Sequence, residues 1–177
     1  MEFWRAIRYQ TRSGALHMGR ASTIAGGRDL TVEAPLEELP LFARAGSIVA
    51  LLPSDVDTLA DDGSGTGLVH LRDRRTQLRL LVLPRGSSVR TVAPGLRVRS
   101  RERRGKWLLG LRSKRRHRLR IEASLATLRR PFRPCSVRLG RRRLHRRSWH
   151  YNSPSRVLNV RVKLRSGRLT VRRCPRR

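Results

Sequence analysis

Apolar and charged residues alternate along most of the second half of the chain. The pattern is clearest in TQLRLLVLP (76–84), GLRVRS (95–100), KWLLGLRS (106–113), HRLRIEA (117–123), RVLNVRVKL (156–164) and GRLTVRR (167–173). Successive side chains of a β-strand point to opposite faces, so a period of two indicates strands that are buried on one face only. We expect leucine, valine and isoleucine to point into a core and the arginines to point into solvent.

Turn signals divide these segments into short strands. Glycine or proline pairs typical of tight connections occur at 62–65, 84–86, 94–95, 104–105, 139–140 and 166–167. The segment SLATLRR (124–130) is long enough for a single helical turn only. The sequence therefore predicts an all-β fold, which we interpret as two small antiparallel β-sandwiches in series.

Charge divides the chain into two parts. Residues 1–73 hold 10 of the 12 acidic residues and 7 of the 42 basic ones, a net charge of −3, whereas residues 74–177 carry +33. We therefore place a boundary near Asp73, with a first sandwich segment at 1–73 and an arginine-rich second segment at 74–177. Only Lys106, Lys114 and Lys163 are lysines, which leaves 39 arginines.

The arginine excess has two explanations. The guanidinium group of arginine binds phosphate through two N–H donors at once, which the ammonium group of lysine does not, but a codon bias toward arginine explains the same excess of arginine over lysine. Because the arginines alternate with apolar residues, we favour solvated strand faces over a polyanion-binding tail. In either case we expect weak, non-specific binding of polyanions.

Membrane insertion and export have no signal in the sequence. Apolar runs of roughly 18 residues or more, which a membrane-spanning helix needs, do not occur. The N-terminal MEFWRAIRY lacks the long apolar run of a signal peptide. We therefore expect no membrane partner, and the sequence leaves the compartment open.

One block, APLEELPLFARAGSIVALLP (34–53), is punctuated differently from the rest. Prolines at three positions and the pair Ala45-Gly46 interrupt its apolar runs, as is typical where a chain leaves one packed layer and enters the next. We expect Gly46 to hold a turn or bulge with positive φ and Arg44 to be held by one of the nearby glutamates, Glu33, Glu37 or Glu38. The apolar residues expected to be largely buried are Leu39, Leu41, Phe42, Ile48, Val49 and Leu51.

This block and the residues just before it resemble a known family. Gly26-Gly27, Ala34-Pro35-Leu36, Pro40-Leu41-Phe42 and Arg44-Ala45-Gly46-Ser47-Ile48 follow one another in AGGRDLTVEAPLEELPLFARAGSIVALLP (25–53). The order is similar to the segment just after the catalytic barrel in glycoside hydrolase family 31, the α-glucosidase and α-xylosidase family. Glu2-Phe3-Trp4 and the later β segments also resemble parts of the region around it.

The resemblance implies a non-catalytic role for this chain. In that family the nucleophile and the general acid/base are aspartates on loops of a (β/α)₈ barrel that precedes this region, and a barrel needs about 250 residues. No catalytic residue is therefore carried over, and we expect the chain alone to be inactive. The resemblance marks Pro35, Pro40, Arg44 and Gly46 as structural residues, and a glycosidase barrel domain or carbohydrate as partner.

Other candidate chemistry is sparse. Asp55, Asp57, Asp61 and Asp62 form the densest carboxylate group, but they lack the full spacing of a calcium loop, so we interpret them as a solvated loop. The five histidines and two cysteines have no metal-ligand spacing. No phosphate loop, dinucleotide fingerprint or nucleophile elbow occurs, and we expect neither a metal nor a cofactor.

The tryptophans and cysteines leave alternatives open. Trp4, Trp107 and Trp149 are candidates for stacking on sugar rings, although single, widely spaced tryptophans are more often core residues. A disulfide between Cys135 and Cys174 would join the last strand to an earlier one if the two are neighbours. We take the core position and free thiols as the default expectations.

Two hypotheses of different class follow. The first is a non-catalytic C-terminal β-sandwich region of a family 31-like glycoside hydrolase, serving O-glycosyl hydrolysis by the parent enzyme. The alternative is a stand-alone arginine-rich β protein that binds nucleic acid or another polyanion. The alternative ranks second, because such binding combines a basic face with aromatic platforms and few aromatic residues accompany the arginines.

Overall fold

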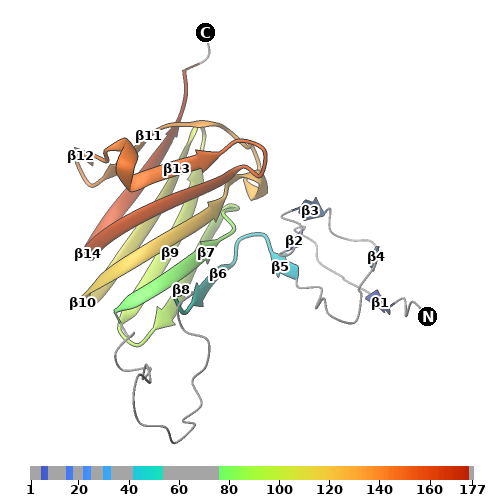
Figure 1. Ribbon diagram of the computed structural model, residues 1–177, viewed down its shortest axis with the longest axis horizontal. Coiled ribbons are helices and arrows are strands. Elements are labelled where there is room, and N and C mark those ends of the chain that lie inside the picture. Colours follow the sequence, from blue (N-terminus) through green and yellow to red (C-terminus); the bar gives the residue numbers. More distant parts are fainter. Residues whose placement is uncertain are drawn as a thin grey trace, which may run out of the picture.

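The computed structural model describes residues 42–53 and 76–175, and before them the backbone of four short strands. These four are β1 (Arg5–Ile7), β2 (Ala15–His17), β3 (Ser22–Ile24) and β4 (Leu30–Val32). The strands that follow are β5 (Phe42–Arg44), β6 (Ile48–Leu51), β7 (Gln77–Val82), β8 (Ser87–Ala93), β9 (Leu96–Arg103), β10 (Lys106–Ser124), β11 (Pro134–Leu139), β12 (Arg142–Arg143), β13 (Trp149–Asn152) and β14 (Val157–Arg173) (Figure 1). Two 3₁₀ turns, η1 (Leu125–Thr127) and η2 (Arg146–Ser148), complete the described elements. The fold is all-β, as predicted, and η1 is the single helical turn expected within 124–130.

Strands β6 to β14 form one sheet of nine strands. Its main order is β12-β11-β14-β10-β7-β6, β13 pairs with β14, and β8 joins through β9, which pairs with β10. All these pairs are antiparallel except β7 and β10, which run parallel from Gln77↔Arg118 to Val82↔Ala123. The prediction of purely antiparallel pairing is wrong here. Strands β8 and β9 separate β7 from β10 in the sequence, and the reversals from β8 to β9 and from β9 to β10 bring the chain back to the direction of β7.

Strands β10 and β14 are long enough to belong to two layers. Residues 106–113 of β10 pair with β9, and residues 118–123 pair with β7. In the same way β14 pairs with β13 through 157–160 and with β11 through 169–173. We call β6, β7, β13 and the adjoining parts of β10 and β14 the β7 half, and β8, β9, β11, β12 and their adjoining parts the β9 half.

The two halves are joined at a bend in the β10–β14 hairpin. The register jumps there from His117↔Leu164 to Arg112↔Ser166, so β10 carries extra residues that β14 lacks. Extra residues in one strand of a pair increase its bend and twist. The hairpin therefore continues from one half into the other, and the inner faces of the halves meet.

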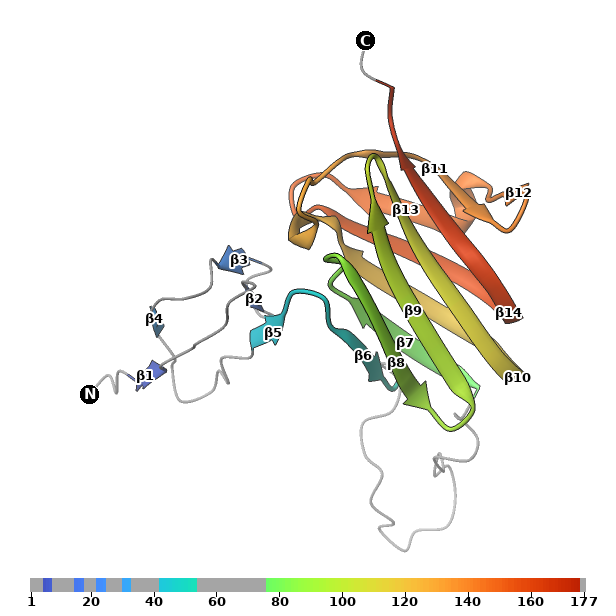
Figure 2. The same ribbon diagram turned by 180° about the vertical axis from the view of Figure 1, so that it is seen from behind.

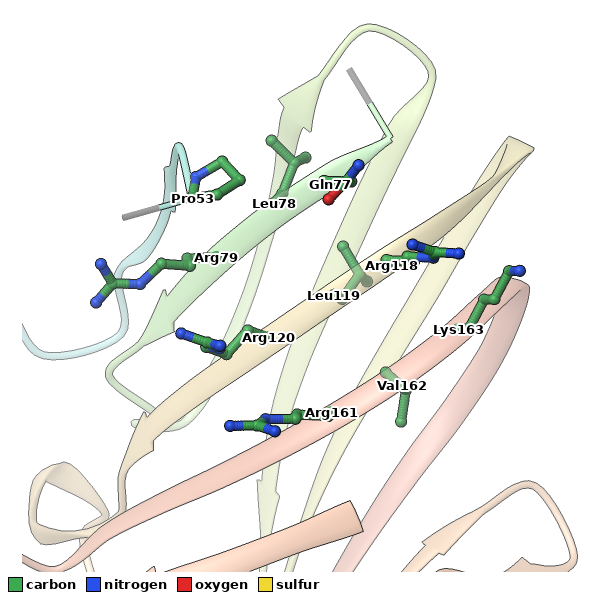
Figure 3. A pocket seen from close by; sticks show the side chains of 10 residues that line it. All are labelled: Pro53, Gln77, Leu78, Arg79, Arg118, Leu119, Arg120, Arg161, Val162 and Lys163. Atoms are coloured by element: carbon green, nitrogen blue, oxygen red, sulfur yellow. The ribbon is translucent and has the colours of Figure 1, made fainter. Parts of the chain in front are cut away.

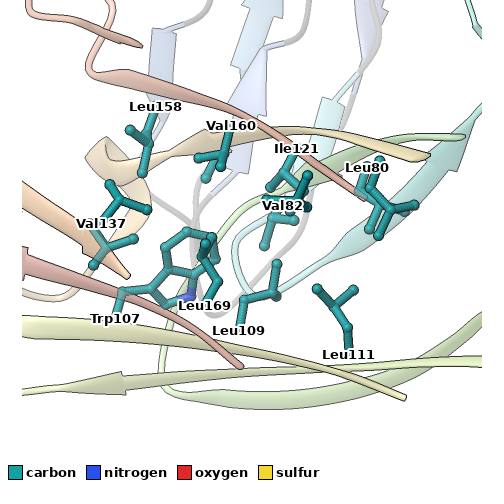
Figure 4. Packing of buried hydrophobic residues seen from close by; sticks show 14 of the residues in the cluster. Leu80, Val82, Trp107, Leu109, Leu111, Ile121, Val137, Leu158, Val160 and Leu169 are labelled. Atoms are coloured by element: carbon teal, nitrogen blue, oxygen red, sulfur yellow. The ribbon is translucent and has the colours of Figure 1, made fainter. Parts of the chain in front are cut away.

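The core fills the space between these inner faces (Figure 4). Fully buried side chains come from both halves: Trp107, Leu109, Val137 and Leu169 from the β9 half, and Leu80, Val82, Ile121 and Val160 from the β7 half. Along β9 the burial alternates strictly from Leu96 to Arg101, with each arginine exposed. The expected orientation, aliphatic residues inward and arginines outward, is confirmed.

The strand boundaries differ from the sequence expectation in two places. The segments 106–113 and 117–123 are one strand of 19 residues, and 156–164 and 167–173 share one strand of 17. Ser166-Gly167, taken as a turn, lies inside β14 at the bend. This pair resembles a turn in the sequence because glycine occurs at strand bulges as well as in turns.

The punctuated block connects two sheets. β5 pairs with β2 in a three-stranded sheet, whereas β6 pairs with β7 in the nine-stranded one. Between them Gly46 has a φ of 97°, and the Ser47 N–H donates to the Arg44 carbonyl at 3.0 Å. The positive φ expected at Gly46 is confirmed, and the chain does pass from one layer to another here.

Burial within this block is lower than expected. Of the described residues, Ile48 is buried, while Phe42, Val49 and Leu51 are half-buried, and Leu39 and Leu41 lie outside the described residues. These three are less completely covered than Ile48 because β5 is in a small sheet and β6 is an edge strand, so each has covering layers on fewer sides. The boundary near Asp73 also lies outside the described residues, and the arrangement as two sandwiches in series stays a prediction.

Cys135 and Cys174 form a disulfide, so the free thiols taken as the default are wrong. Cys135 is in β11 and Cys174 directly follows β14, and these two strands pair up to Pro134↔Arg173. Their Cα atoms are 4.8 Å apart, within the range that a disulfide spans. Strand pairing, which the sequence does not reveal, brings the two cysteines together.

Candidate functional site

The outer face of the β7 half carries basic side chains in register across three strands. Arg79 of β7, Arg120 of β10 and Arg161 of β14 are Cα partners in one row. The next row consists of Gln77, Arg118 and Lys163. Adjacent strands lie about 4.8 Å apart, so each row brings its cations close together (Figure 3).

A hollow of about 630 Å³ lies at these rows. Its lining comes from both rows, with Pro53 at the end of β6 and the apolar residues between the cations: Leu78, Leu119 and Val162. Leu119 and Val162 are buried core residues and Leu78 packs against the core, so the outer face of the hollow is basic rather than apolar. Such a surface suits a negatively charged ligand.

One carboxylate balances part of this charge. The Arg79 guanidinium donates from Nε to Glu122 Oε1 at 3.1 Å and from Nη2 to Oε2 at 3.3 Å, a two-point contact. The two side chains are 30% and 24% exposed. Arg120 and Arg161 are Cα partners, and the carboxylate that lines a hollow with them, Glu122, is paired with Arg79 instead. Like charges directly opposite destabilise a sheet. Their forks of N–H donors could hold an oxyanion.

Glu102 and Glu122 are the carboxylates of the described residues 42–53 and 76–175. Glu102 accepts hydrogen bonds from the backbone N–H of Gly86 at 2.9 Å and of Arg130 at 3.3 Å. Both carboxylates are thus engaged in holding the fold. Within the described part of the chain, no three histidine, cysteine or acidic side chains gather to bind a metal ion, and no helix could cross a bilayer.

The described tryptophans are core residues. Trp107 is 0% exposed and donates from Nε1 to Ser100 Oγ at 2.9 Å. Trp149 is 5% exposed, and the Arg146 guanidinium lies over its ring at 4.4 Å. Neither ring has a free face for a sugar, so stacking at Trp107 and Trp149 is wrong and their core position is confirmed. Trp4 lies outside the described residues.

The structural residues of the family-like block are only partly described. Gly46 closes the turn between β5 and β6, and a Cβ there would meet the Arg85 carbonyl oxygen at 3.6 Å. Arg44 is exposed at the end of β5, and the glutamates expected beside it lie outside the described residues. Pro35 and Pro40 lie outside them as well, and their roles stay predictions.

The bend between the halves contains a buried polar pair that the sequence did not indicate. His117 and Ser113 are both buried, and His117 Nε2 lies 2.8 Å from Ser113 Oγ. Burial and then the positive charge of Arg115 lower the pKa of His117 below its ordinary value of 6.5. The three intervening positions, Lys114, Arg115 and Arg116, are all basic, and they hide this pairing in the sequence because the bulge brings its two ends together.

Comparison with known proteins supports the fold. No family model and no curated protein matches the chain. Two solved structures of a GH31 dextranase from Flavobacterium johnsoniae are similar to it: one complexed with glucose, with a TM-score of 0.67 at 14% identity, and a mutant complexed with isomaltotriose, with 0.68 at 15%. Each match covers 96% of this chain and 24% of the dextranase. The chain thus shares its fold with about a quarter of that enzyme.

Proposed function

We propose that this chain is a non-catalytic β-sandwich region of a glycoside hydrolase related to family 31. In this role it packs beside a catalytic barrel and serves O-glycosyl hydrolysis by that barrel. The observation that carries the proposal is the fold match over 96% of the chain to 24% of a GH31 dextranase. A match that covers nearly all of one chain and about a quarter of the other is expected when the first corresponds to one region of a larger enzyme.

The sequence block adds support that does not depend on the fold match. Gly46, which the family-like pattern places after Arg-Ala, occupies the turn where the chain leaves the sheet of β5 for that of β6. The residue pattern and the change of sheet thus agree on the role of the segment 42–53.

The described carboxylates support a non-catalytic role. A retaining glycosidase needs two carboxyl groups about 5–5.5 Å apart on either side of the bond that is cleaved. Glu102 is opposite Trp107 at the start of β10, and Glu122 is near the end of that 19-residue strand. Neither can serve as the partner of the other, and both already accept structural hydrogen bonds.

Activity of the purified chain tests the non-catalytic part of the proposal. We expect no release of aglycone from aryl α-glucosides or α-xylosides above the buffer blank. The double variant Asp55→Asn/Asp57→Asn, which removes the densest carboxylates, is the control and should behave identically. Turnover that follows the protein through purification would contradict the proposal, whether or not it survives in this variant.

The genomic context of the chain tests whether it belongs to a glycoside hydrolase. The DNA upstream of the Met1 codon should encode, in frame or as a neighbouring gene, a (β/α)₈ barrel with two catalytic aspartates. Co-expressed with this chain, that barrel should co-purify with it and hydrolyse α-glucosides faster than the barrel alone. A locus without a barrel, or a barrel that neither binds nor responds to the chain, overturns the proposal.

A further inference from the structure

The outer face of the β9 half carries more uncompensated charge than any other described surface. Its outward positions on β9, β10, β11 and β14 hold nine exposed cations: Arg97, Arg99, Arg101, Arg103, Lys106, Arg112, Arg138, Arg168 and Arg172. Figure 2 shows this side of the sheet, with β8, β9, β10 and β14 toward the viewer. Neither described carboxylate is at an outward position here. We call this surface the β9 face.

A hollow of about 730 Å³ opens in the β9 face over Gly110. Gly110 is in β10 between Arg99 of β9 and Arg168 of β14, its Cα partners on either side. Arg97, Arg112 and Thr170 complete the polar lining of the hollow. Four guanidinium groups thus surround a floor that carries no side chain.

Neither the backbone nor packing requires a glycine at position 110. Its φ is outside the left-handed region, and an added Cβ would meet its nearest neighbours, the oxygen and Cβ of Arg99, at 3.8 and 3.9 Å. These are ordinary contact distances. A glycine inside a strand weakens it and often marks a place where a ligand approaches the backbone closely.

The charges around the hollow also lack a partner within the described chain. Arg97 and Arg112 are directly opposite each other, an arrangement of like charges that destabilises a strand pair. An oxyanion bound between the two guanidinium groups would make their contribution to the stability of the strand pair favourable. No outward position of β8 to β11 or β14 in this half carries an aromatic side chain, so stacking on a base or a sugar is not the binding mode.

We propose that the hollow over Gly110 is a binding site for a phosphoryl group, held by Arg99, Arg112 and Arg168. Guanidinium forks match the oxygens of phosphate in geometry and keep their charge at every physiological pH. The Thr170 hydroxyl supplies a further donor at the rim. A phosphate ester of low molecular weight and the backbone of a nucleic acid both present this group, and the experiment distinguishes them.

Filling the hollow without changing charge is the sharpest test. Gly110→Leu should weaken binding of inorganic pyrophosphate, measured by calorimetry at about 0.15 M salt, by about 10-fold or more, because the ligand loses at least one charged hydrogen bond. The matched control is Ser87→Leu, which adds the same side chain at an exposed position of β8 outside the hollow. It should leave the affinity unchanged.

A second pair of variants separates a site from a diffuse charge. Arg168→Gln and Arg103→Gln remove one positive charge each from the β9 face, but only Arg168 lines the hollow. We expect about 10-fold weaker pyrophosphate binding for Arg168→Gln and less than about 2-fold for Arg103→Gln. Equal losses for the two variants, or an affinity that Gly110→Leu leaves intact, would overturn the proposal.

The source of the phosphoryl group follows from the same variants with a short DNA duplex. If Gly110→Leu weakens duplex binding as much as pyrophosphate binding, the nucleic-acid backbone occupies the hollow. If duplex binding stays the same and falls steeply with salt, the hollow takes a small phosphate ester and the duplex binds the surface charge alone. Failure of this site leaves the proposed relation to glycoside hydrolases untouched, because that relation is independent of the β9 face.

Discussion

The β7 half and the β9 half share two continuous strands but are held together differently. The β9 half buries Trp107, whose indole N–H donates to Ser100, and ties β11 to the end of β14 by a disulfide. In the β7 half the completely buried side chains are aliphatic, Trp149 is 5% exposed, and the outer face has a partly exposed ion pair between Arg79 and Glu122. Partly exposed pairs contribute little to stability. We infer that the β9 half is the more resistant to unfolding.

The comparison also separates what the charge does from what the core does. In both halves the arginines occupy outward positions and the aliphatic residues inward ones, although the chain carries a formal net charge of +30. Burial of apolar area drives folding, whereas net charge affects solubility and association. The excess of arginine therefore determines the surface of both halves and the fold of neither.

The largest expected effect is loss of the Trp107 side chain. Trp107→Ala should lower the free energy of unfolding by about 3–5 kcal/mol, because it leaves a cavity in the β9 half and an unpaired Ser100 hydroxyl. Ile121→Val, the control in the β7 half, should cost about 0.5–1.5 kcal/mol. Urea unfolding followed by circular dichroism measures both. Nearly equal losses would show that the tryptophan does not distinguish the two halves.

Removing the disulfide should have the next largest effect. The double variant Cys135→Ser/Cys174→Ser opens a loop with a sequence separation of 39 residues, for which loop-closure entropy predicts a loss of about 4 kcal/mol, with about 2 as the lower end for native bridges. Hydrogen exchange should accelerate first in β11 and in the part of β14 paired with it. A midpoint that reducing agent leaves unchanged would contradict this assignment.

The smallest expected effect is the pH response of the bend between the halves. Because the folded-state pKa of His117 is lowered, the neutral imidazole is the form that the fold favours. Its contribution is fully present above the unfolded pKa of 6.5 and is lost as the pH falls below that value. Thermal unfolding should therefore show a midpoint that decreases from pH 7.5 to 5.5. The change should be smaller in His117→Gln and unaltered in His150→Gln, at an exposed position. A decrease of the same size in all three proteins would exclude His117 as its cause.

The sequence predicted the fold class because alternation is a local property. Segments such as 95–100 and 117–123 carry their own inward and outward assignment, and four of the predicted glycine turns have positive φ at Gly86, Gly95, Gly105 and Gly140. Strand length was harder to predict, because the basic residues of the bend in β10 and Ser166-Gly167 in β14 resemble connections. Local pattern does not distinguish a bulge from a turn.

The candidate sites could not be predicted because they depend on pairing register. Arg79, Arg120 and Arg161 are about 40 residues apart in the chain, and no feature of their own segments places them in one row. The same holds for Cys135 and Cys174, and for Arg99 and Arg168 on either side of Gly110. A register shift of one residue would turn all of these side chains to the other face. Only the complete sheet determines which cations gather.

The outward arginines also matter before the chain has folded. Segments of alternating apolar residues are the ones that stack into cross-β aggregates, and edge strands such as β8 and β12 offer unpaired backbone groups to other chains. In β9 every second residue from Arg97 to Arg103 is a cation, so two copies stacked in register would place like charges directly against each other. The runs IVALL (48–52), mostly in the edge strand β6, and LLVL (80–83), in and just after β7, have no such protection. The same alternation that forms the sheet thus acts as a gatekeeper against self-association, and these two runs are where we expect self-association to begin.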